Sequence, residues 1–483
     1  MALLCLLVFL TERGRVPDPD LWWHMRNAEH LLTTGSLPRI DTYSFTVHGN
    51  PWINHEWLAE IPYYLAWKAG GPAGVQLLVV VLLQAIFLGV FYLCWKSSGN
   101  LKGSFVVTCL AVLLGIVSFG PRTILYGYAY VVILLILLQR FRLTGRSPLW
   151  MLPFLFCLWI NTHGSWSLGL ILFAIYIGSG LVEGRWGMIE ARRWTPSQLR
   201  KLLVTMGASI GALFVNPYGY RLVLYPYDLA FHQKLNISHV AEWVSVDFHD
   251  LRGKVVLVIL AGMLFSALWG RHRWRLEELA LALFGLYCGM TYIRFLFLAA
   301  IVVPPLLAKS LDFLPPYRPE IDKPVLNALI LGTALAAMVV FFPSSKKLYE
   351  SIDEQYPAEV LPYLKSHPLP GRVLNFYLWG GWMEWNVRDV KTFIDSRVDI
   401  FEYAGVLKDY IDLLGLKDSL AIVDKYRIQY ILFPPDEPFT YVLQHDPNWK
   451  PVFTGKVCLL FERVGPIPAG AGAAETIPIP ASP

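Results

Sequence analysis

Long apolar blocks separated by short polar segments occupy the first 343 residues of the chain. A helix needs about 20 apolar residues to cross the hydrocarbon core of a bilayer, and several of these blocks approach that length. Where a block is shorter, we expect its helix to continue into the polar flanks. The pattern predicts about eleven membrane-spanning helices, at about residues 1–11, 72–95, 103–119, 123–139, 148–160, 166–182, 202–215, 255–269, 277–290, 295–309 and 325–343.

The first block is the shortest, with about ten apolar residues starting at Met1. It is either a span without its beginning or the core of a signal peptide. A signal peptide has a basic segment before its core and an A-x-A site after it, and neither flanks this block. We therefore interpret it as a span.

Basic residues predict the orientation, because Lys and Arg are enriched in cytoplasmic loops. With the N-terminus inside, the cytoplasmic loops have a density of basic residues about threefold that of the opposite loops; these loops are residues 96–102, 140–146, 184–201, 271–275 and 309–324. An odd number of spans then places the C-terminal residues outside the cytoplasm. Residues 12–71 become a large first external loop.

The chain changes character near residue 344, where the apolar blocks end. Residues 344–464 alternate short β-rich runs with helical patterns, which is typical of a soluble α/β domain. We expect strands at Arg372–Tyr377, Lys391–Ile394, Tyr430–Phe433 and Val457–Glu462, and helices at Ala358–His367, Gly405–Leu414 and Ser419–Tyr426. Residues 465–483 are rich in Pro, Ala and Gly and predict a disordered tail. The fold class expected is an α-helical polytopic membrane protein with a C-terminal extracytoplasmic α/β domain.

Composition agrees with this interpretation and excludes several classes of protein. Hydrophobic residues make up 55% of the chain and charged residues 16%, against about 25% charged in soluble domains. The net charge is +5 and the basic residues are dispersed through short loops, so no nucleic-acid surface is predicted. The six cysteines lie far apart, which predicts neither a disulfide framework nor a zinc site.

The unusual polar residues fall almost entirely on the predicted external side. Charged and imidazole groups at a membrane face are costly unless they line a wet cavity, so they predict one polar pocket at the outer leaflet. The residues singled out are Asp18, Asp20 and His24 with Trp22 and Trp23, then His55, Glu56 and Trp57, Arg122, Asn161, His163, Asn216, Tyr218, Arg221, Glu242 and Arg294.

Most of these residues also have a purely structural interpretation. Asp18 and Asp20 could cap the helix that begins near Leu21, and His163 could bond between helices. The Trp-rich stretch around His55 and Glu56 could be an interfacial anchor, and Asn216-Pro-Tyr-Gly219 is a turn signal. Arginines such as Arg122 and Arg294 could extend to the interface, but they stand on the side that the charge bias disfavours, which favours an anionic partner.

Carboxylates and arginines in an outer-leaflet pocket suit glycosyl transfer from a polyprenyl-phosphate carrier, because nucleotide sugars are not expected outside the cytoplasm. A carboxylate would act as the general base for the acceptor hydroxyl, and arginines would stabilise the leaving phosphate. We predict Asp20 or Asp18 as the base, with His24 and Glu56 also catalytic. The substrate-binding candidates are His55, Arg122, Asn161, His163, Asn216, Tyr218, Arg221, Glu242, Arg294, Asp395 and Arg397.

Trp22, Trp23 and Trp57 could stack on sugar rings, and a divalent metal, Mg or Mn, is possible between the acids and the phosphate. Asp395, Arg397 and Asp399 follow an expected strand end, where open α/β sheets place ligands. An ion-pair network supporting a turn is equally consistent with these three residues. The C-terminal domain shows no Gly-rich phosphate loop and is not expected to bind nucleotides.

Five motifs stand out together: Asp18-Pro-Asp-Leu-Trp-Trp-His24, Asn54-His-Glu-Trp57, Asn161-Thr-His-Gly164, Asn216-Pro-Tyr-Gly219 and Phe393-Ile-Asp-Ser-Arg-Val-Asp399. They resemble a poorly characterised group of bacterial membrane proteins related to the GT-C glycosyltransferases, near the RgtA/B/C/D-like and protein-mannosyltransferase-like enzymes. The resemblance covers nearly the whole chain, although the first span is shorter than the family's. It implies a GT-C fold, a polyprenyl-phosphate-sugar donor, a bacterial inner (plasma) membrane location and a catalytic acid in the first external loop, matching Asp18 and Asp20.

Two other classes compete with a glycosyltransferase of cell-envelope glycan biosynthesis. A transporter or flippase for lipid-linked sugars would place its polar residues near the midplane, often with inverted repeats, and no clear repeat is visible. A noncatalytic glycan-assembly subunit would retain the fold without turnover. The partners expected are the lipid-linked donor, membrane lipid and a glycan, lipid or protein acceptor.

Overall fold

The computed structural model describes residues 1–239, 241–270 and 272–467. The predicted tail lies mainly outside the described residues. The chain divides into two compact units: unit 1 comprises residues 1–15, 76–226 and 241–343, and unit 2 comprises residues 16–75, 227–240 and 344–483. Unit 2 therefore combines the first loop with the C-terminal residues.

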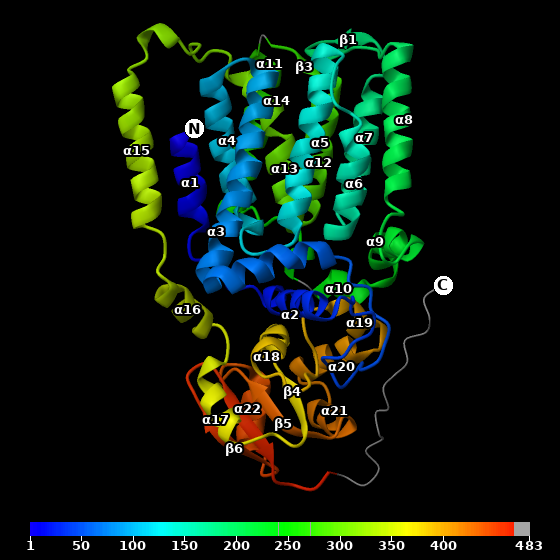
Figure 1. Cartoon of the computed structure of the whole chain (residues 1–483), viewed down its shortest axis with the longest axis vertical. Helices are drawn as coiled ribbons and strands as arrows, with labels where there is room; N and C mark the ends of the chain where they lie inside the picture. Colours follow the sequence, from blue (N-terminus) through cyan, green and yellow to red (C-terminus); the bar gives the residue numbers. More distant parts are fainter. Residues whose placement is uncertain (240, 271, 468–483) are drawn as a thin grey trace. The chain divides into compact units, whose positions relative to one another are not determined.

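Unit 1 is a bundle of helices with a small sheet at one end (Figure 1). Its helices are α1 (Ala2–Glu12), the part of α3 (Trp57–Ser98) after residue 75, α4 (Leu101–Gly115), α5 (Ile124–Thr144), α6 (Met151–Thr162), α7 (Trp166–Ser179), α8 (Pro196–Ala212), α9 (Tyr220–His232) as far as residue 226, α11 (Leu251–Trp269), α12 (Leu276–Thr291), α13 (Leu296–Val302), α14 (Pro304–Leu307) and α15 (Pro324–Val340). The sheet is β1 (Gly184–Trp186), β2 (Ile189–Ala191) and β3 (Trp274–Arg275), in that order.

Helix α13 is at the core of this bundle, since all of its residues are buried. The ring of Phe297 on α13 stacks on Tyr128 of α5 at a centroid distance of 4.2 Å. Other helices expose large apolar side chains, such as Phe154, which is 66% exposed, and Leu264, which is 62% exposed. Such surface is expected where lipid, instead of water, surrounds the helices.

Four helices are long and apolar enough to cross a membrane, or up to six if two bent helix pairs each form one span. Each predicted apolar block coincides with a helix, and three of these helices, α1, α6 and α7, are shorter and apolar. The protein thus has the helices of a membrane protein. The number of about eleven spans and the orientation remain predictions.

Unit 2 combines helices with a four-stranded sheet in the order β4-β5-β7-β6. Strands β4 (Arg372–Asn375) and β5 (Ile428–Phe433) are parallel, and β7 (Leu459–Arg463) pairs antiparallel with β5 and with β6 (Trp449–Thr454). The helices are α2 (Pro19–Thr34), the start of α3, α10 (Lys234–His239), α16 (Ser345–Asp353), α17 (Leu361–Ser366), α18 (Gly380–Asn386), α19 (Val398–Tyr403), α20 (Val406–Leu414), α21 (Ser419–Lys425) and α22 (Pro438–His445).

Three of the four predicted strands are confirmed as β4, β5 and β7, and the three predicted helices are confirmed as α17 with its preceding turn, α20 and α21. The strand predicted at Lys391–Ile394 is wrong. Thr392 forms only an isolated bridge, to Ser44 of the first loop. The backbone N–H of Phe393 donates to the side chain of Asn375 at 2.8 Å instead of joining the sheet.

Helix α3 is broken inside unit 2 by a Gly70-Gly71-Pro72 sequence. Gly71 has φ +56°, a left-handed conformation that glycine adopts readily, and Pro72 is suited to the start of a new helical segment. The predicted span at 72–95 therefore begins at this break. The segment before it carries Glu60, which belongs to the candidate site.

Candidate functional site

Asp18 and Asp20 lie at the start of α2, where Pro19 occupies the first turn. Asp18 is in the extended conformation of an N-cap, and its Oδ1 accepts from the backbone N–H of Asp20 at 3.0 Å. The capping interpretation of Asp18 is thus confirmed. Asp20 is half-buried, and its carboxylate accepts from the indole N–H of Trp23 at 3.3 Å. This bond, within the first turns of α2, orients the carboxylate.

His24 lies one turn after Asp20, on the same face of α2, between two glutamates. Its Nδ1 is 3.0 Å from Glu60 Oε1 and its Nε2 is 3.4 Å from Glu56 Oε2. The amides of Asn27 and Asn54 also donate to Glu60, at 3.1 and 2.8 Å. His24 and Glu60 are buried, so this cluster fixes the helix that carries Asp20.

His24 and His55, both in the first loop, have pKa values shifted in opposite directions. Burial alone would lower the pKa of His24, but the hydrogen bond to Glu60 and the charges of Glu56 and Glu60 outweigh it and raise the pKa above 6.5. His55, whose Nε2 is 3.5 Å from Glu56, is only 23% exposed. Desolvation by the surrounding protein lowers the pKa of His55 to about 4 despite the charge of Asp399.

These shifts predict opposite pH dependences of stability. Because the pKa of His24 is raised on folding, its protonation stabilises the folded protein fully below pH 6.5, and this contribution is lost as the pH rises through the raised pKa. His24→Gln should cost about 1.5–3 kcal/mol at low pH and less at high pH. Melting temperatures of the natural protein and of His24→Gln, measured from pH 5 to 9, should differ less as the pH rises.

His55→Asn is the matched comparison for this experiment. The pKa of His55 is lowered on folding, so the natural protein loses stability as the pH falls from 6.5 towards 4, and the variant should avoid that loss. If the melting temperatures of the natural protein and both variants changed with pH in parallel, the protonation states assigned to His24 and His55 would be contradicted.

Asp395 and Arg397 form a buried ion cluster with Asp41 of the first loop. Arg397 Nε and Nη2 bind both oxygens of Asp395, at 2.8 and 2.6 Å, and Nη2 is 2.7 Å from Asp41 Oδ1. Glu384 lies 3.8 Å from Nη2, and burial together with Asp395 raises its pKa well above the usual range. The guanidinium carbon is also 4.9 Å from the Trp52 ring centre. The ion-pair interpretation is confirmed for Asp395 and Arg397, whereas a substrate-binding role of these residues remains a prediction.

Ser396, which stands between Asp395 and Arg397 of the ion cluster, connects the cluster to Asp20 through Trp23. The indole N–H of Trp23 donates both to Asp20 and to the hydroxyl of Ser396, the latter at 3.0 Å. Unit 2 therefore gathers Asp18, Asp20, His24 and Glu56 around α2 and supports them from the C-terminal motif.

In unit 1, Arg122, Glu242 and Arg294 come together. Arg122 forms an ion pair with Glu242, and the guanidinium carbon of Arg294 lies 4.4 Å from the ring centre of the adjacent Trp243. A backbone bond from Ile293 N to Val244 O, at 2.9 Å, holds the two segments side by side. The four residues make a half-buried group in which one guanidinium, that of Arg294, lies beside an aromatic ring and the other, that of Arg122, pairs with a carboxylate.

Other predicted residues of unit 1 organise turns. Asn161 donates to the carbonyl of Val215 at 2.9 Å, which joins the ends of α6 and α8. His163 Nδ1 accepts from the backbone N–H of Ser165 at 2.9 Å and so shapes the turn before α7. Asn216 accepts from Tyr218 N at 2.8 Å and closes the turn before α9, confirming the turn interpretation. Arg221 is exposed on the first turn of α9.

Sequence reasoning missed Glu60, Asp41 and Glu384. Glu60 had a signal, because it stands four residues after Glu56, a spacing that places two side chains on the same side of a helix. Asp41 had none, since its partner Arg397 stands 356 positions away in the sequence. Glu384 had none either, because it lies in a separate helix, α18, and no helical or strand spacing connects it with Arg397. Within the described parts of the chain, no group of three His, Cys, Asp or Glu side chains is arranged to hold a metal ion.

No family model and no curated protein matches the sequence. Solved structures do match the fold. The Archaeoglobus fulgidus oligosaccharyltransferase, tethered to an acceptor peptide with an NVT sequon, aligns with a TM-score of 0.56 and 12% identity over 90% of this chain and 68% of its own. ArnT from Cupriavidus metallidurans, bound to undecaprenyl phosphate, aligns at 0.53 and 12% identity over 97% and 98%.

The mycobacterial arabinofuranosyltransferase AftD aligns at a TM-score of 0.51 and 14% identity, over 95% of this chain and 41% of its own. These neighbours are GT-C glycosyltransferases, so the chain has a GT-C-like fold, as the sequence motifs predicted. At such low identity the likeness concerns the fold alone.

Proposed function

We propose that this protein is an integral-membrane glycosyltransferase that moves a sugar from a polyprenyl-phosphate carrier to an acceptor outside the cytoplasm. The observation that carries the proposal is the fold likeness, over nearly the full length of both chains, to ArnT solved with undecaprenyl phosphate. A half-buried acid on a rigidly held helix and an arginine beside a tryptophan support it.

Asp20 is the general base in this proposal. Asp18 already caps α2 through the backbone N–H of Asp20, whereas the half-buried Asp20 carboxylate stands within the first turn and accepts from the indole N–H of Trp23 at 3.3 Å. The carboxylate takes the proton of the acceptor hydroxyl while the hydroxyl oxygen bonds to the anomeric carbon. The bond from that carbon to the phosphate oxygen breaks, and the lipid phosphate departs with the electron pair. Attack opposite the leaving group inverts the anomeric configuration.

Arg294 and Arg122 are the phosphate-binding candidates. Arginine presents a planar fork that matches phosphate oxygens, and it keeps its charge at every relevant pH. Glu242 already neutralises part of the Arg122 charge, so Arg294 is the stronger candidate. The acceptor class, whether glycan, lipid or protein, and the participation of Mg or Mn stay open in this proposal.

Release of the carrier tests the function without knowledge of the acceptor. The full chain in liposomes is given undecaprenyl-phosphate-linked pentoses and hexoses together with a membrane extract, and free undecaprenyl phosphate is measured. We expect undecaprenyl phosphate to be released from donors of one sugar class. If the release requires the membrane extract, the sugar is being transferred to an acceptor. Movement of the intact donor across the bilayer without any release would instead favour a flippase.

Arg294→Ala should weaken donor binding in this assay. Loss of a charged contact to phosphate corresponds to an increase of about 10- to 100-fold in KM for the donor. Arg294→Lys should restore part of the loss because it keeps the charge without the fork. Arg318→Ala, at an exposed residue of the same unit, is the control, and equal effects of both alanine variants would exclude a specific role.

A further inference from the structure

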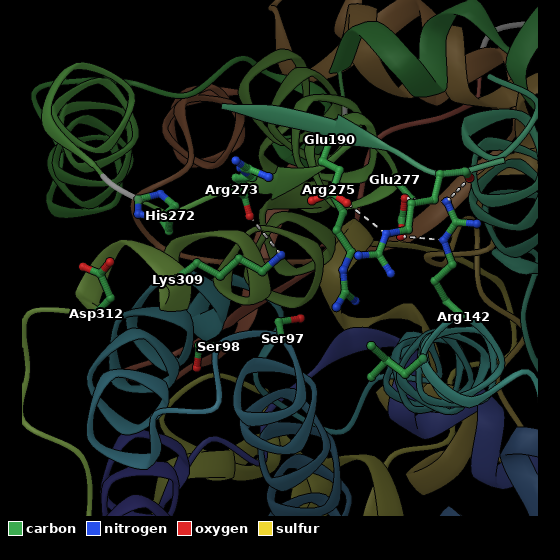
Figure 2. A pocket seen from close by; sticks show the side chains of 12 residues that line it. Ser97, Ser98, Arg142, Glu190, His272, Arg273, Arg275, Glu277, Lys309 and Asp312 are labelled. Atoms are coloured by element: carbon green, nitrogen blue, oxygen red, sulfur yellow. Dashed lines mark hydrogen bonds and ion pairs between the residues drawn. The ribbon is translucent and has the colours of Figure 1, made fainter. Parts of the chain in front are cut away.

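A polar cavity of about 360 Å³ lies at one end of the unit 1 bundle, beside the small sheet (Figure 2). Its walls come from segments far apart in the sequence: residues 97–98, 142–143, 190–192, 272–277 and 309–312. All five segments include parts of the loops that the distribution of basic residues assigns to the cytoplasmic side. The cavity belongs to neither of the groups considered for glycosyl transfer.

Two cations of this cavity, Arg142 and Lys309, are held in position by ion pairs with glutamates. Arg142 forms a two-pronged pair with Glu277, at 3.0 and 3.3 Å, and its guanidinium stacks at 3.9 Å on Trp194. Lys309 is buried and pairs with Glu278. Figure 2 shows Lys309 and Arg275 in the space between His272 on one side and Arg142 with Glu277 on the other.

Positive charge remains after these pairs are counted. Five cations line the cavity, Arg142, Arg192, Arg273, Arg275 and Lys309, against Glu190, Glu277 and Asp312, and Glu278 adds a fourth acid behind Lys309. The ion pair of Arg192 with Glu190 uses Nε alone, at 2.9 Å, and the side chain is 78% exposed. The structure records no ion pair for Arg273 among the residues it describes. Two arginine forks therefore have donors for an incoming anion.

We propose that this cavity binds the phosphate group of an anionic membrane phospholipid. Arginine forks match phosphate oxygens, and the volume suits a group of headgroup size. Leu143 lines the same cavity and is 41% exposed, which gives an apolar contact for the glycerol or acyl portion. Basic cavities at the ends of membrane helices are suited to anionic headgroups, because such lipids concentrate there. The proposal does not rest on glycosyl transfer.

Native mass spectrometry of the full chain in detergent tests the site, with phosphatidylglycerol as the probe and phosphatidylcholine as the uncharged reference. The test variant combines Arg192→Ala with Arg273→Ala, both exposed residues. Since each arginine near an anionic membrane contributes several-fold, we expect phosphatidylglycerol affinity to fall about 30-fold. The control combines Arg193→Ala, beside Arg192, with Arg200→Ala in α8; both arginines are exposed and neither lines the cavity.

Selective loss in the test variant, with an unchanged melting temperature, supports the proposal. Inorganic phosphate is tested in a second experiment. If phosphate stabilises the protein as well as phosphatidylglycerol does and also displaces the lipid, the ligand is a soluble phosphate compound and the proposal of a lipid is overturned. Equal binding of both lipids, or equal weakening in the two double variants, overturns the site itself, since the cations would then only hold loops together.

Discussion

Replacing Arg397 by methionine is expected to destabilise unit 2 by about 3–5 kcal/mol, because it leaves the carboxylates of Asp395 and Asp41 buried without their cation. Arg397 is 1% exposed, and both acids are fully buried. Burial would lower the pKa of Arg397, but its acidic neighbours raise it well above the usual range, so it is charged at any working pH. For a unit of this size the loss corresponds to a fall in melting temperature of about 6–20 °C.

Arg388→Met provides the matched control. Arg388 pairs with Glu29 at 2.8 Å in the same unit, but its side chain is 43% exposed, and exposed pairs contribute about 0–1 kcal/mol. Tryptophan fluorescence during heating in detergent reports both variants. A fall no larger for Arg397→Met than for Arg388→Met would show that the buried cluster is not what joins the first loop to the C-terminal residues.

A double-mutant cycle with Asp41→Asn makes this test specific. Removing the Asp41 charge in the Arg397→Met background should recover part of the lost stability, because one fewer carboxylate is buried without a partner. If the two single effects simply add, the 2.7 Å contact between Arg397 and Asp41 makes no energetic contribution.

Local signals in the sequence predicted much of the fold. Asp18-Pro19 predicted the helix start that α2 shows, and Asn216 predicted a turn that its side chain closes. Apolar blocks located the helices of the bundle, and basic residues identified loops that meet around one cavity. Each of these signals is a pattern of a few neighbouring residues or of local composition, and it can therefore be recognised in the sequence alone.

Pairings across the sequence were not predictable in the same way. Arg397 bonds Asp41 across 356 positions, and no periodicity connects them. The error at Lys391–Ile394 has the same origin: the segment is apolar enough for a strand, but the side chain of Asn375 and the first loop take its backbone bonds. Arg122 and Glu242 were both predicted as site residues, yet only the fold makes them partners.

Asp20→Asn is expected to reduce kcat for sugar transfer by about 10²–10⁴-fold, the usual contribution of a general base. The change keeps the size of the side chain and its acceptor oxygen for Trp23, so α2 and the melting temperature should be preserved. Donor KM should change little, because the phosphate is assigned to Arg294 in unit 1. Release of undecaprenyl phosphate under saturating donor measures kcat, and a titration of donor measures KM.

Asp18→Asn separates the two acids in the same assay. Asparagine caps helices as well as aspartate does, so the bond to Asp20 N is retained and activity should fall only a few-fold if Asp18 serves as a cap. A large loss in Asp18→Asn with little loss in Asp20→Asn would transfer the base assignment to Asp18. Full activity in both variants would remove the first-loop acids from the chemistry, and a noncatalytic role for the pair would then follow from their place at the start of α2. The protonation of His24 offers an internal check, because the Asp20 charge helps to raise the pKa of His24, which should therefore fall in Asp20→Asn.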